Sequence, residues 1–469
     1  MKISLAKVKK VHFIGICGIG ISAIARLLKT AGKEVSGSDV KSSSICDMLK
    51  KIGIKIYIGH SEKNIAKDID LVIYTPAIPD NNLELEKAKK IGIKTINYPQ
   101  VLGLIFNDKI GIAVCGTHGK STTTAMIGLV LDDAKLDPTI AIGSIVPRYN
   151  SNLRIGKSQY FVVEACEYKR SFLNLRPKIT ILNNIEIDHA DYYRDIDDLK
   201  SAFKEFVSNL PHDGILICNG DDTNINDLNS ELKFHHPELK IISFGQKKEN
   251  NLQVSDFRFE TGITKYNVSY LGNDLGEFCI KLPGLFNIYN SLAAISLGIV
   301  LGISIETIKK SLANFAGIWR RFEIKGRYKN TLIVSDYAHH PTAVKATIEA
   351  AKKFCPERRI FAVFQPHQHN RVKQLYKYFL ECFNVADIII LSEIVDVVGR
   401  EKKEDKSLSS SYLVEDIKKI DSTMMNKIFY AKNLEKTRKL IDEKIQDGDL
   451  LLIMTAGDMY KIADEMIKE

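Results

Sequence analysis

Short apolar runs alternate with helical patterns along most of the chain. Because strands separated by helices usually pair in parallel, this alternation predicts a doubly wound α/β domain over residues 1–107. Its strands are expected at Val11–Ile16, Glu34–Ser38, Lys55–Ile58, Leu71–Tyr74 and Lys94–Ile96.

The alternation resumes at Ile110–Cys115 and then changes character. Three strand-like runs without helices between them follow at about 252–281, with a Gly272-Asn273 turn, and two helical patterns cover about 287–302 and 304–315. Such a run predicts an antiparallel patch. We therefore expect a central α/β domain over residues 108–318, with further strands at Tyr160–Glu164, Ile179–Leu182 and Ile215–Cys218.

A third region begins near Trp319 and returns to strand–helix alternation. It predicts a Rossmann-like domain over residues 319–469, with a charged, serine-rich surface loop at 400–411. Three domains suit a chain of 469 residues, which exceeds the size of one compact core. The strands of this domain are expected at Thr331–Ser335, Ile360–Phe364, Asp387–Leu391 and Asp449–Met454.

Composition narrows the classes of function. The net charge of +9 is dispersed, and no basic cluster is interleaved with aromatic residues, which argues against a nucleic-acid-binding surface. No apolar run reaches the roughly 18 residues of a membrane span. The first residues resemble a secretory signal, but three glycines interrupt the apolar run. Eight irregularly spaced cysteines without a C-x-x-C pair predict reduced thiols, and hence a cytoplasmic enzyme.

The first glycine-rich turn follows the run Val11–Ile16 and contains Gly15, Gly18 and Gly20. A turn between a strand and a helix lets backbone amides approach a diphosphate, and Asp39 lies where acidic residues often bind ribose. The spacing G-x-x-G-x-G differs from that of dinucleotide-binding turns. It favours some diphosphate ligand over NAD, while glycines that merely allow tight packing remain an alternative.

The second glycine-rich turn, Gly116–Ser121, follows Ile110–Cys115 and precedes a helical pattern. Its form, G-T-x-G-K-[ST], is that of a short phosphate loop. Backbone amides would surround the phosphates, Lys120 would neutralise the β and γ groups, and the Ser121 hydroxyl would bind magnesium. We therefore predict ATP binding at this turn.

Further magnesium ligands are expected at two strand ends. Glu164 ends one apolar strand, and the group Asn184, Asp188, His189 and Asp191 follows another. The carboxyl ends of strands carry the sites of α/β proteins. An ion-paired Glu164 and a hydrogen-bonded structural His189 are the alternatives to metal ligands.

Several motifs in this order resemble the Mur ligase family over essentially the whole chain. They are His12–Ile16, Gly116–Thr124, Asn184–Glu186 with Asp188-His189, Pro283-Gly284 with Asn287 and Asn290, Arg320–Glu323, Asp336–Pro341 and Val363–His367.

The resemblance implies a UDP-binding domain, a central ATPase and an amino-acid-binding domain. It implies an ATP- and Mg²⁺-dependent ligase of peptidoglycan precursor synthesis. Such an enzyme joins L-alanine to the lactyl carboxylate of UDP-N-acetylmuramic acid through an acyl phosphate. The implied partners are these small molecules, with neither nucleic acid nor membrane, for a monomer or weak homodimer in the cytoplasm.

The resemblance also implies roles for individual residues. The UDP moiety would contact Gly18, Ile19, Gly20, Asp39 and Thr75. ATP would contact Gly116, Thr117, His118, Gly119, Lys120, Ser121, Thr122, Asn287, Asn290, Arg321 and Asp336. The metal would be bound by Ser121, Glu164 and His189, and the amino acid by His340, His367 and Arg371. The catalytic group would be Lys120, Glu164, His189 and Arg321.

Some positions depart from the family pattern. Phe286 replaces a common histidine, Ser121 a threonine, and Gln368 an arginine. The segments around Asn183 and Asp191 are closer to the ligase that recycles murein tripeptide, which is therefore an alternative, as is an NAD-dependent oxidoreductase. Either His189 or His340 could deprotonate the amine. The pairs His339/His340 and His367/His369 are expected to be pocket or structural imidazoles rather than a zinc cluster.

Overall fold

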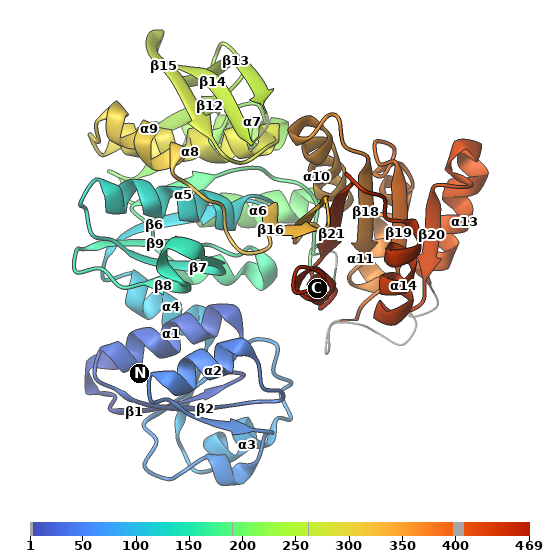
Figure 1. Ribbon diagram of the computed structural model, residues 1–469. Helices are drawn as coiled ribbons and strands as arrows, with labels where there is room; N and C mark the ends of the chain where they lie inside the picture. Colours follow the sequence, from blue (N-terminus) through green and yellow to red (C-terminus); the bar gives the residue numbers. More distant parts are fainter. Residues whose placement is uncertain (1–2, 190, 261, 397–407) are drawn as a thin grey trace.

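The computed structural model describes residues 3–189, 191–260, 262–396 and 408–469 and contains three β-sheets (Figure 1). Each sheet is accompanied by helices from its own part of the chain, which confirms the predicted three-domain α/β class. The exact domain boundaries remain predictions. Residues 400–407 of the predicted surface loop lie outside the described residues, and Ser410 already begins a helix.

The first sheet is entirely parallel and lies at the N-terminal end of the molecule, in blue in Figure 1. Its strand order reverses at β1, the strand that leads into the first glycine loop. Across the sheet the strands are β3 (Lys55–Ile58), β2 (Glu34–Asp39), β1 (Lys10–Ile14), β4 (Leu71–Tyr74) and β5 (Lys94–Asn97). The helices are α1 (Ile19–Thr30), α2 (Ser44–Lys51), α3 (Leu83–Lys90) and α4 (Tyr98–Phe106).

The central sheet is mixed, with a parallel middle and the predicted antiparallel patch at one end. The strands in order are β15 (Asn273–Ile280), β14 (Ile263–Tyr270), β13 (Leu252–Glu260), β12 (Lys240–Gly245), β11 (Ile215–Asn219), β10 (Ile179–Leu182), β6 (Ile110–Cys115), β9 (Tyr160–Glu164), β7 (Thr139–Val146) and β8 (Ser151–Arg154). The helices are α5 (Lys120–Asp133), α6 (Ile196–Val207), α7 (Thr223–His235), α8 (Leu285–Val300) and α9 (Ile305–Ala313).

The third sheet is parallel except for its first strand and lies beside the central domain, in orange to red in Figure 1. Its strands in order are β16 (Glu323–Tyr328), β17 (Thr331–Asp336), β21 (Leu450–Thr455), β18 (Ile360–Gln365), β19 (Ile388–Ser392) and β20 (Ile428–Ala431). The helices are α10 (Pro341–Phe354), α11 (His369–Gln374), α12 (Tyr376–Glu381), α13 (Ser410–Ile420), α14 (Leu434–Lys444) and α15 (Tyr460–Met466).

The first and central domains share one apolar core. Helix α4 contributes Val101 and Phe106 to it, and Phe106 lies against Phe161 of β9 with ring centroids 5.7 Å apart. Gly103 of α4 faces the Asn174 carbonyl so closely that a Cβ there would clash. The two sheets are therefore held in contact by packing as well as by the chain that joins them.

The cysteines depart from the expectation of reduced thiols. Cys17, in the first glycine loop, and Cys46, in α2, form a disulfide with their Cα atoms 5.2 Å apart. The prediction was wrong for this pair because the fold, rather than a short spacing, brings the loop after β1 against the first turn of α2. Both cysteines are buried.

Within the ranges described above, no helix is both long and apolar enough to span a bilayer.

Candidate active site

The phosphate loop occupies the carboxyl end of β6, in the middle of the central sheet. Gly116 and Gly119 have φ angles of 126° and 80°, which favour glycine. Gly119 is the N-cap of α5 and offers no side-chain acceptor to the first amides of the helix. These amides and the helix dipole make the loop suited to an anion.

The two strands that flank β6 bring the predicted metal ligands to the same edge. Val114 of β6 is paired with Glu164 of β9, and Cys115 is paired with Leu182 of β10. Glu164 therefore ends beside the loop, as does the segment after Leu182. Asn184 fixes the loop directly, because its Oδ1 accepts a hydrogen bond of 2.7 Å from the His118 amide.

Lys120 is ion-paired with a carboxylate of the protein. Its Nζ lies 2.9 Å from Glu167 Oε2 and donates to the carbonyls of Gly116 and Thr117. Burial opposes the lysine charge, but the acidic neighbours of Lys120, Glu167 foremost, together hold its pKa above the ordinary value. Lys120 is thus a cation whose present counter-ion is a carboxylate.

Ser121 and Glu164, each predicted as a magnesium ligand, form a hydroxyl–carboxylate pair. The Ser121 hydroxyl donates to Glu164 Oε2 at 3.0 Å, and the Gly143 amide donates to Oε1. Burial raises the pKa of Glu164, while these donors and Lys120 act in the opposite direction. Hard oxygen ligands of this kind suit Mg²⁺, so the pair fits the metal that the sequence implied.

His189 lies next to the same carboxylate that pairs with Lys120. Its Nε2 is 3.2 Å from Glu167 Oε1, and its buried Nδ1 has no hydrogen-bond partner among the residues that the structure describes. An orphaned buried ring nitrogen fits a group that a ligand would satisfy. Asp191, also considered as a metal ligand, instead accepts from the Tyr168 hydroxyl and does not line the cavity.

A cavity of about 970 Å³ connects the phosphate loop with the third domain. All of the predicted ATP-, metal- and amino-acid-binding residues line it except Gly116. The third domain contributes Arg321, Asp336, His340, His367 and Arg371. The last four converge because they end or follow β17 and β18, which flank β21 in parallel, so their carboxyl ends open on the same side. Arg321 precedes the antiparallel β16, whose first residue Glu323 is paired with Ser335 near the end of β17.

The predicted amino-acid-binding residues are already partnered by groups of the chain. Arg371 pairs with Asp188 across the domain boundary, its Nε donating to Asp188 Oδ1 at 3.0 Å, and both side chains are buried. Burial would raise the pKa of Asp188, but Arg371 holds it well below the ordinary value. Burial, reinforced by His118, lowers the pKa of His340 to about 4, so this ring is neutral at neutral pH.

Asn287 and Asn290 line the cavity, and their side chains also form hydrogen bonds with groups of the chain. Asn290 Oδ1 accepts from Thr123 at 3.0 Å, and its Nδ2 donates to Asn287 Oδ1. Asn287 in turn donates to the Pro283 carbonyl. Both predicted adenine contacts therefore also brace the start of α5. Asp336 similarly accepts from the amides of Phe322 and Ala338.

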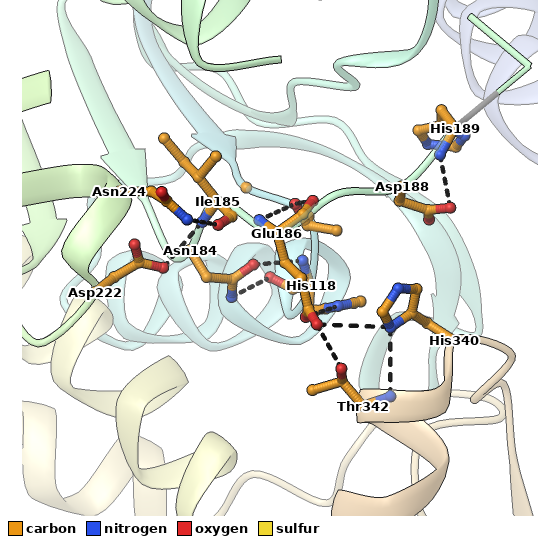
Figure 2. Close-up of polar contacts among 12 residues, drawn as sticks. His118, Asn184, Ile185, Glu186, Asp188, His189, Asp222, Asn224, His340 and Thr342 are labelled. Atoms are coloured by element: carbon orange, nitrogen blue, oxygen red, sulfur yellow. Dashed lines mark hydrogen bonds and ion pairs between the residues drawn. The ribbon is translucent and has the colours of Figure 1, made fainter. Parts of the chain in front are cut away.

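One further group of side chains could hold a metal ion. Ligand atoms of His118, Glu186 and His340 all lie within 4.8 Å of one another. His340 belongs to the pair His339/His340 considered in the sequence, whereas His118 belongs to the phosphate loop and to neither pair. However, His340 Nδ1 also accepts from the Thr342 amide at 3.3 Å and so caps α10. Figure 2 shows this group between the phosphate loop and the third domain.

The first glycine loop forms a second candidate site. Asp39 Oδ2 accepts from the Cys17 amide at 2.9 Å, so the predicted ribose ligand also fixes the loop. Thr75 packs against Gly15, where a Cβ would clash with its methyl group. Ile19 and Gly20 line a cavity of about 160 Å³ between the first and central domains, and Glu164 lines its opposite side.

The sequence did not predict a role for Glu167 or Glu186. Glu167 lies three residues after Glu164, and Glu186 lies inside the quoted motif Asn184–Glu186. In both cases the signal was an acidic residue just beyond a strand whose end faces the phosphate loop. Sequence alone gave no partner for either carboxylate.

Comparisons with known proteins agree along the whole chain. Residues 10–110 match the Mur ligase family catalytic domain, 114–298 the Mur ligase middle domain and 320–457 the Mur ligase glutamate ligase domain. A UDP-N-acetylmuramate–L-alanine ligase from Caldanaerobacter subterraneus is 40% identical over 100% of this chain and 99% of its own length.

Two solved structures resemble the complete chain. The UDP-N-acetylmuramate–alanine ligase from Thermotoga maritima has a TM-score of 0.82 at 27% identity, covering 98% of each chain. A murein peptide ligase from Psychrobacter arcticus has a TM-score of 0.73 at 25% identity with the same coverage. The chain therefore belongs to the Mur ligase family.

Proposed function

We propose that this chain is an ATP- and Mg²⁺-dependent ligase that joins L-alanine to the lactyl carboxylate of UDP-N-acetylmuramic acid, a step of peptidoglycan precursor synthesis. The observation that carries the proposal is the shared cavity, where a phosphate loop and a Ser121–Glu164 pair face the basic residues of the third domain. Family membership leaves the oxidoreductase alternative without support.

The chemistry begins with a carboxylate, which does not react with an amine because its leaving group is poor. Transfer of the γ-phosphoryl group of ATP to this carboxylate gives an acyl phosphate and ADP. Attack of the amine on the carbonyl carbon then forms the amide and releases phosphate. The protein must mainly position two anions and neutralise their charge. Lys120 and Arg321 supply cations for this task.

Ser121, Glu164 and His189 would hold Mg²⁺, which when bound supplies further positive charge at the phosphates. Glu167 has a different role in this scheme. Its carboxylate is paired with Lys120 and with His189, and phosphate would replace it as the lysine's counter-ion.

The third domain would bind the amino acid. His340 Nδ1 accepts from the Thr342 amide, so the neutral ring carries its proton on the buried Nε2, which has no partner within the described part of the chain. That N–H is a donor for an oxygen of the incoming amino acid. Arg371 would bind the amino acid's carboxylate in exchange for Asp188.

The UDP moiety would lie on the first glycine loop, near Gly18–Gly20 and Thr75. The cavity beside Ile19 and Gly20 supports this placement, because Glu164 lines it as well. A substrate bound across this boundary would extend from the first loop toward the phosphate loop. We further propose a cytoplasmic location and a monomer or weak homodimer, which sedimentation at several protein concentrations would test.

The experiment that tests the function is a Mg²⁺-dependent ligation assay with the purified chain. UDP-N-acetylmuramic acid is offered with L-alanine, glycine, L-serine or murein tripeptide, and ADP and product mass are measured. We expect the L-alanine adduct at the highest kcat/KM. Preference for the tripeptide would make the chain a recycling ligase, and no ADP release with any of the four would contradict ligase activity.

A further inference from the structure

Glu186 connects the phosphate loop to the third domain. Its Oε2 accepts a hydrogen bond of 2.8 Å from His118 Nε2, and its Oε1 accepts one from the Thr342 hydroxyl (Figure 2). His118 belongs to the loop itself, whereas Thr342 lies in the first turn of α10. One carboxylate therefore contacts both sides of the cavity.

The backbone of Glu186 is tied to the same loop. The Thr117 hydroxyl donates to the Glu186 carbonyl at 2.7 Å, and the Glu186 amide donates back to that hydroxyl at 2.9 Å. Thr117 lies three residues before Lys120 in the phosphate loop. A movement of the loop on taking up phosphate must therefore displace Glu186 or break this pair of hydrogen bonds.

On the other side, Thr342 is adjacent to the amino-acid pocket. Its amide donates to Nδ1 of His340, the N-cap of α10, so the carboxylate and the imidazole contact the same residue. Glu186 is ionised at neutral pH: burial opposes its charge, but donation by His118 and Thr342 holds its pKa below the ordinary value. Hydrogen bonds to a charged acceptor are among the stronger ones in proteins.

We propose that Glu186 is a positioning residue that docks the third domain on the phosphate loop and thereby sets the place of His340. The proposal rests on the proposed function for the identity of the substrates. The Asp188–Arg371 pair is a second, separate contact across the same boundary. Loss of Glu186 therefore loosens the start of α10 without separating the domains.

The test is hydrogen exchange of the full-length protein, ligand-free and with Mg-ADP, on Glu186→Ala, Thr342→Val and the double variant. We expect each single variant to speed exchange in the first turn of α10 by roughly tenfold, because each removes the same charged hydrogen bond. The double variant should exchange no faster than either single variant. Thr342→Ser keeps the hydroxyl and is the matched control, expected to behave as the wild type.

The proposal predicts a kinetic effect of the same origin. Thr342→Val should raise KM for L-alanine about tenfold, with a smaller change in KM for ATP, and Thr342→Ser should restore it. If Glu186→Ala does not fold, Glu186→Gln, which removes the charge, replaces it in the cycle.

Two results would overturn the proposal. One is that Thr342→Val speeds exchange in the first turn of α10 by the same factor in the wild type and in Glu186→Ala. The other is that neither single variant changes the exchange rate there. Hydrogen exchange can be measured whether or not the protein catalyses the ligation. A chain that fails the ligation assay but shows non-additive exchange would contradict the proposed function and leave the docking role standing.

Discussion

The two glycine-rich loops of this chain have similar backbones and different chemistry. Each follows a strand that is paired in parallel on both sides and precedes a helix whose N-cap is a glycine without a capping side chain. The first loop is held by Asp39 and a disulfide and has no cation of its own. The second holds a half-buried Lys120 among the carboxylates Glu164 and Glu167.

The difference shows that the backbone of such a loop favours binding of an anion, while the side chains determine which reaction the bound anion can undergo. Free amides at a helix N-terminus suit any phosphate. Only the second loop adds a lysine and a hydroxyl–carboxylate pair, the groups that a phosphoryl transfer requires. We therefore assign binding to the first loop and chemistry to the second.

The largest effect is expected where the second loop loses its cation. Lys120→Ala should lower kcat by roughly a thousandfold, since a preorganised charge at the transferring phosphoryl group is removed. The fold should persist, as judged by circular dichroism and the melting temperature. Lys41→Ala, an exposed lysine near the first loop, is the control and should leave kcat unchanged. Near-normal turnover of Lys120→Ala would mean that ATP is bound elsewhere.

The next effect concerns the metal. Glu164→Gln keeps an acceptor for Ser121 and Gly143 but removes the charge, so the Mg²⁺ concentration that gives half-maximal activity should rise by about 100-fold. A magnesium titration of the initial rate measures it. An unchanged requirement would remove Glu164 from the metal ligands, and a lower melting temperature without a metal effect would indicate a structural role only.

A smaller and more selective effect is expected in the first loop. Asp39→Ala removes the acceptor of the Cys17 amide, and the loosened loop should bind the UDP substrate about tenfold more weakly. Titration calorimetry with UDP-N-acetylmuramic acid measures the Kd, and Asp39→Asn, which retains an acceptor, should lose less. An equal loss of ATP affinity would show that the two loops do not act separately.

The smallest effect on activity is expected from a change in the N-terminal domain that alters its stability. Burial opposes the charge of Glu84, but donation by His12, Ser38 and Asn64 holds its pKa below the ordinary value. Such a group stabilises the fold above the unfolded-state pKa, and the contribution is lost as pH falls through the folded-state pKa.

Glu84→Gln should therefore lower the free energy of unfolding by about 1–3 kcal/mol at pH 7. The difference from the wild type should begin to shrink as pH falls below about 4.5. Urea unfolding at pH 7, 5 and 4 measures both quantities. A difference that grows on acidification would have the wrong sign for a depressed pKa.

The sequence predicted most of the fold because its buried strands are apolar runs. It missed β12 and β20 although both are apolar runs. It also missed strands whose residues are polar or interrupted: β7 contains Gly143 and Ser144, and β16 is largely polar with a bulge at Lys325. Such strands are defined by their pairing partners, which the local pattern does not contain. The disulfide was missed for a related reason, because 29 residues separate Cys17 and Cys46.

The candidate site was predicted residue by residue, but its internal partners were not. Motifs named Lys120, His189 and Arg371, whereas the structure adds Glu167 as the partner of the first two. Asp188, considered in the sequence as a metal ligand, is instead the partner of Arg371. A motif identifies groups that contact a ligand. The ion pairs join residues that are distant in the sequence, within the central domain for Glu167 and across to the third domain for Asp188 and Arg371, so they require the three-dimensional arrangement.

The most direct test of the central claim is a crystal structure with a non-hydrolysable ATP analogue and Mg²⁺. The account predicts phosphates on the amides of residues 117–121, with Lys120 Nζ turned from Glu167 to the β and γ phosphates and the metal on Ser121 and Glu164. Nucleotide bound on the first glycine loop, with the Lys120–Glu167 pair intact, would contradict it.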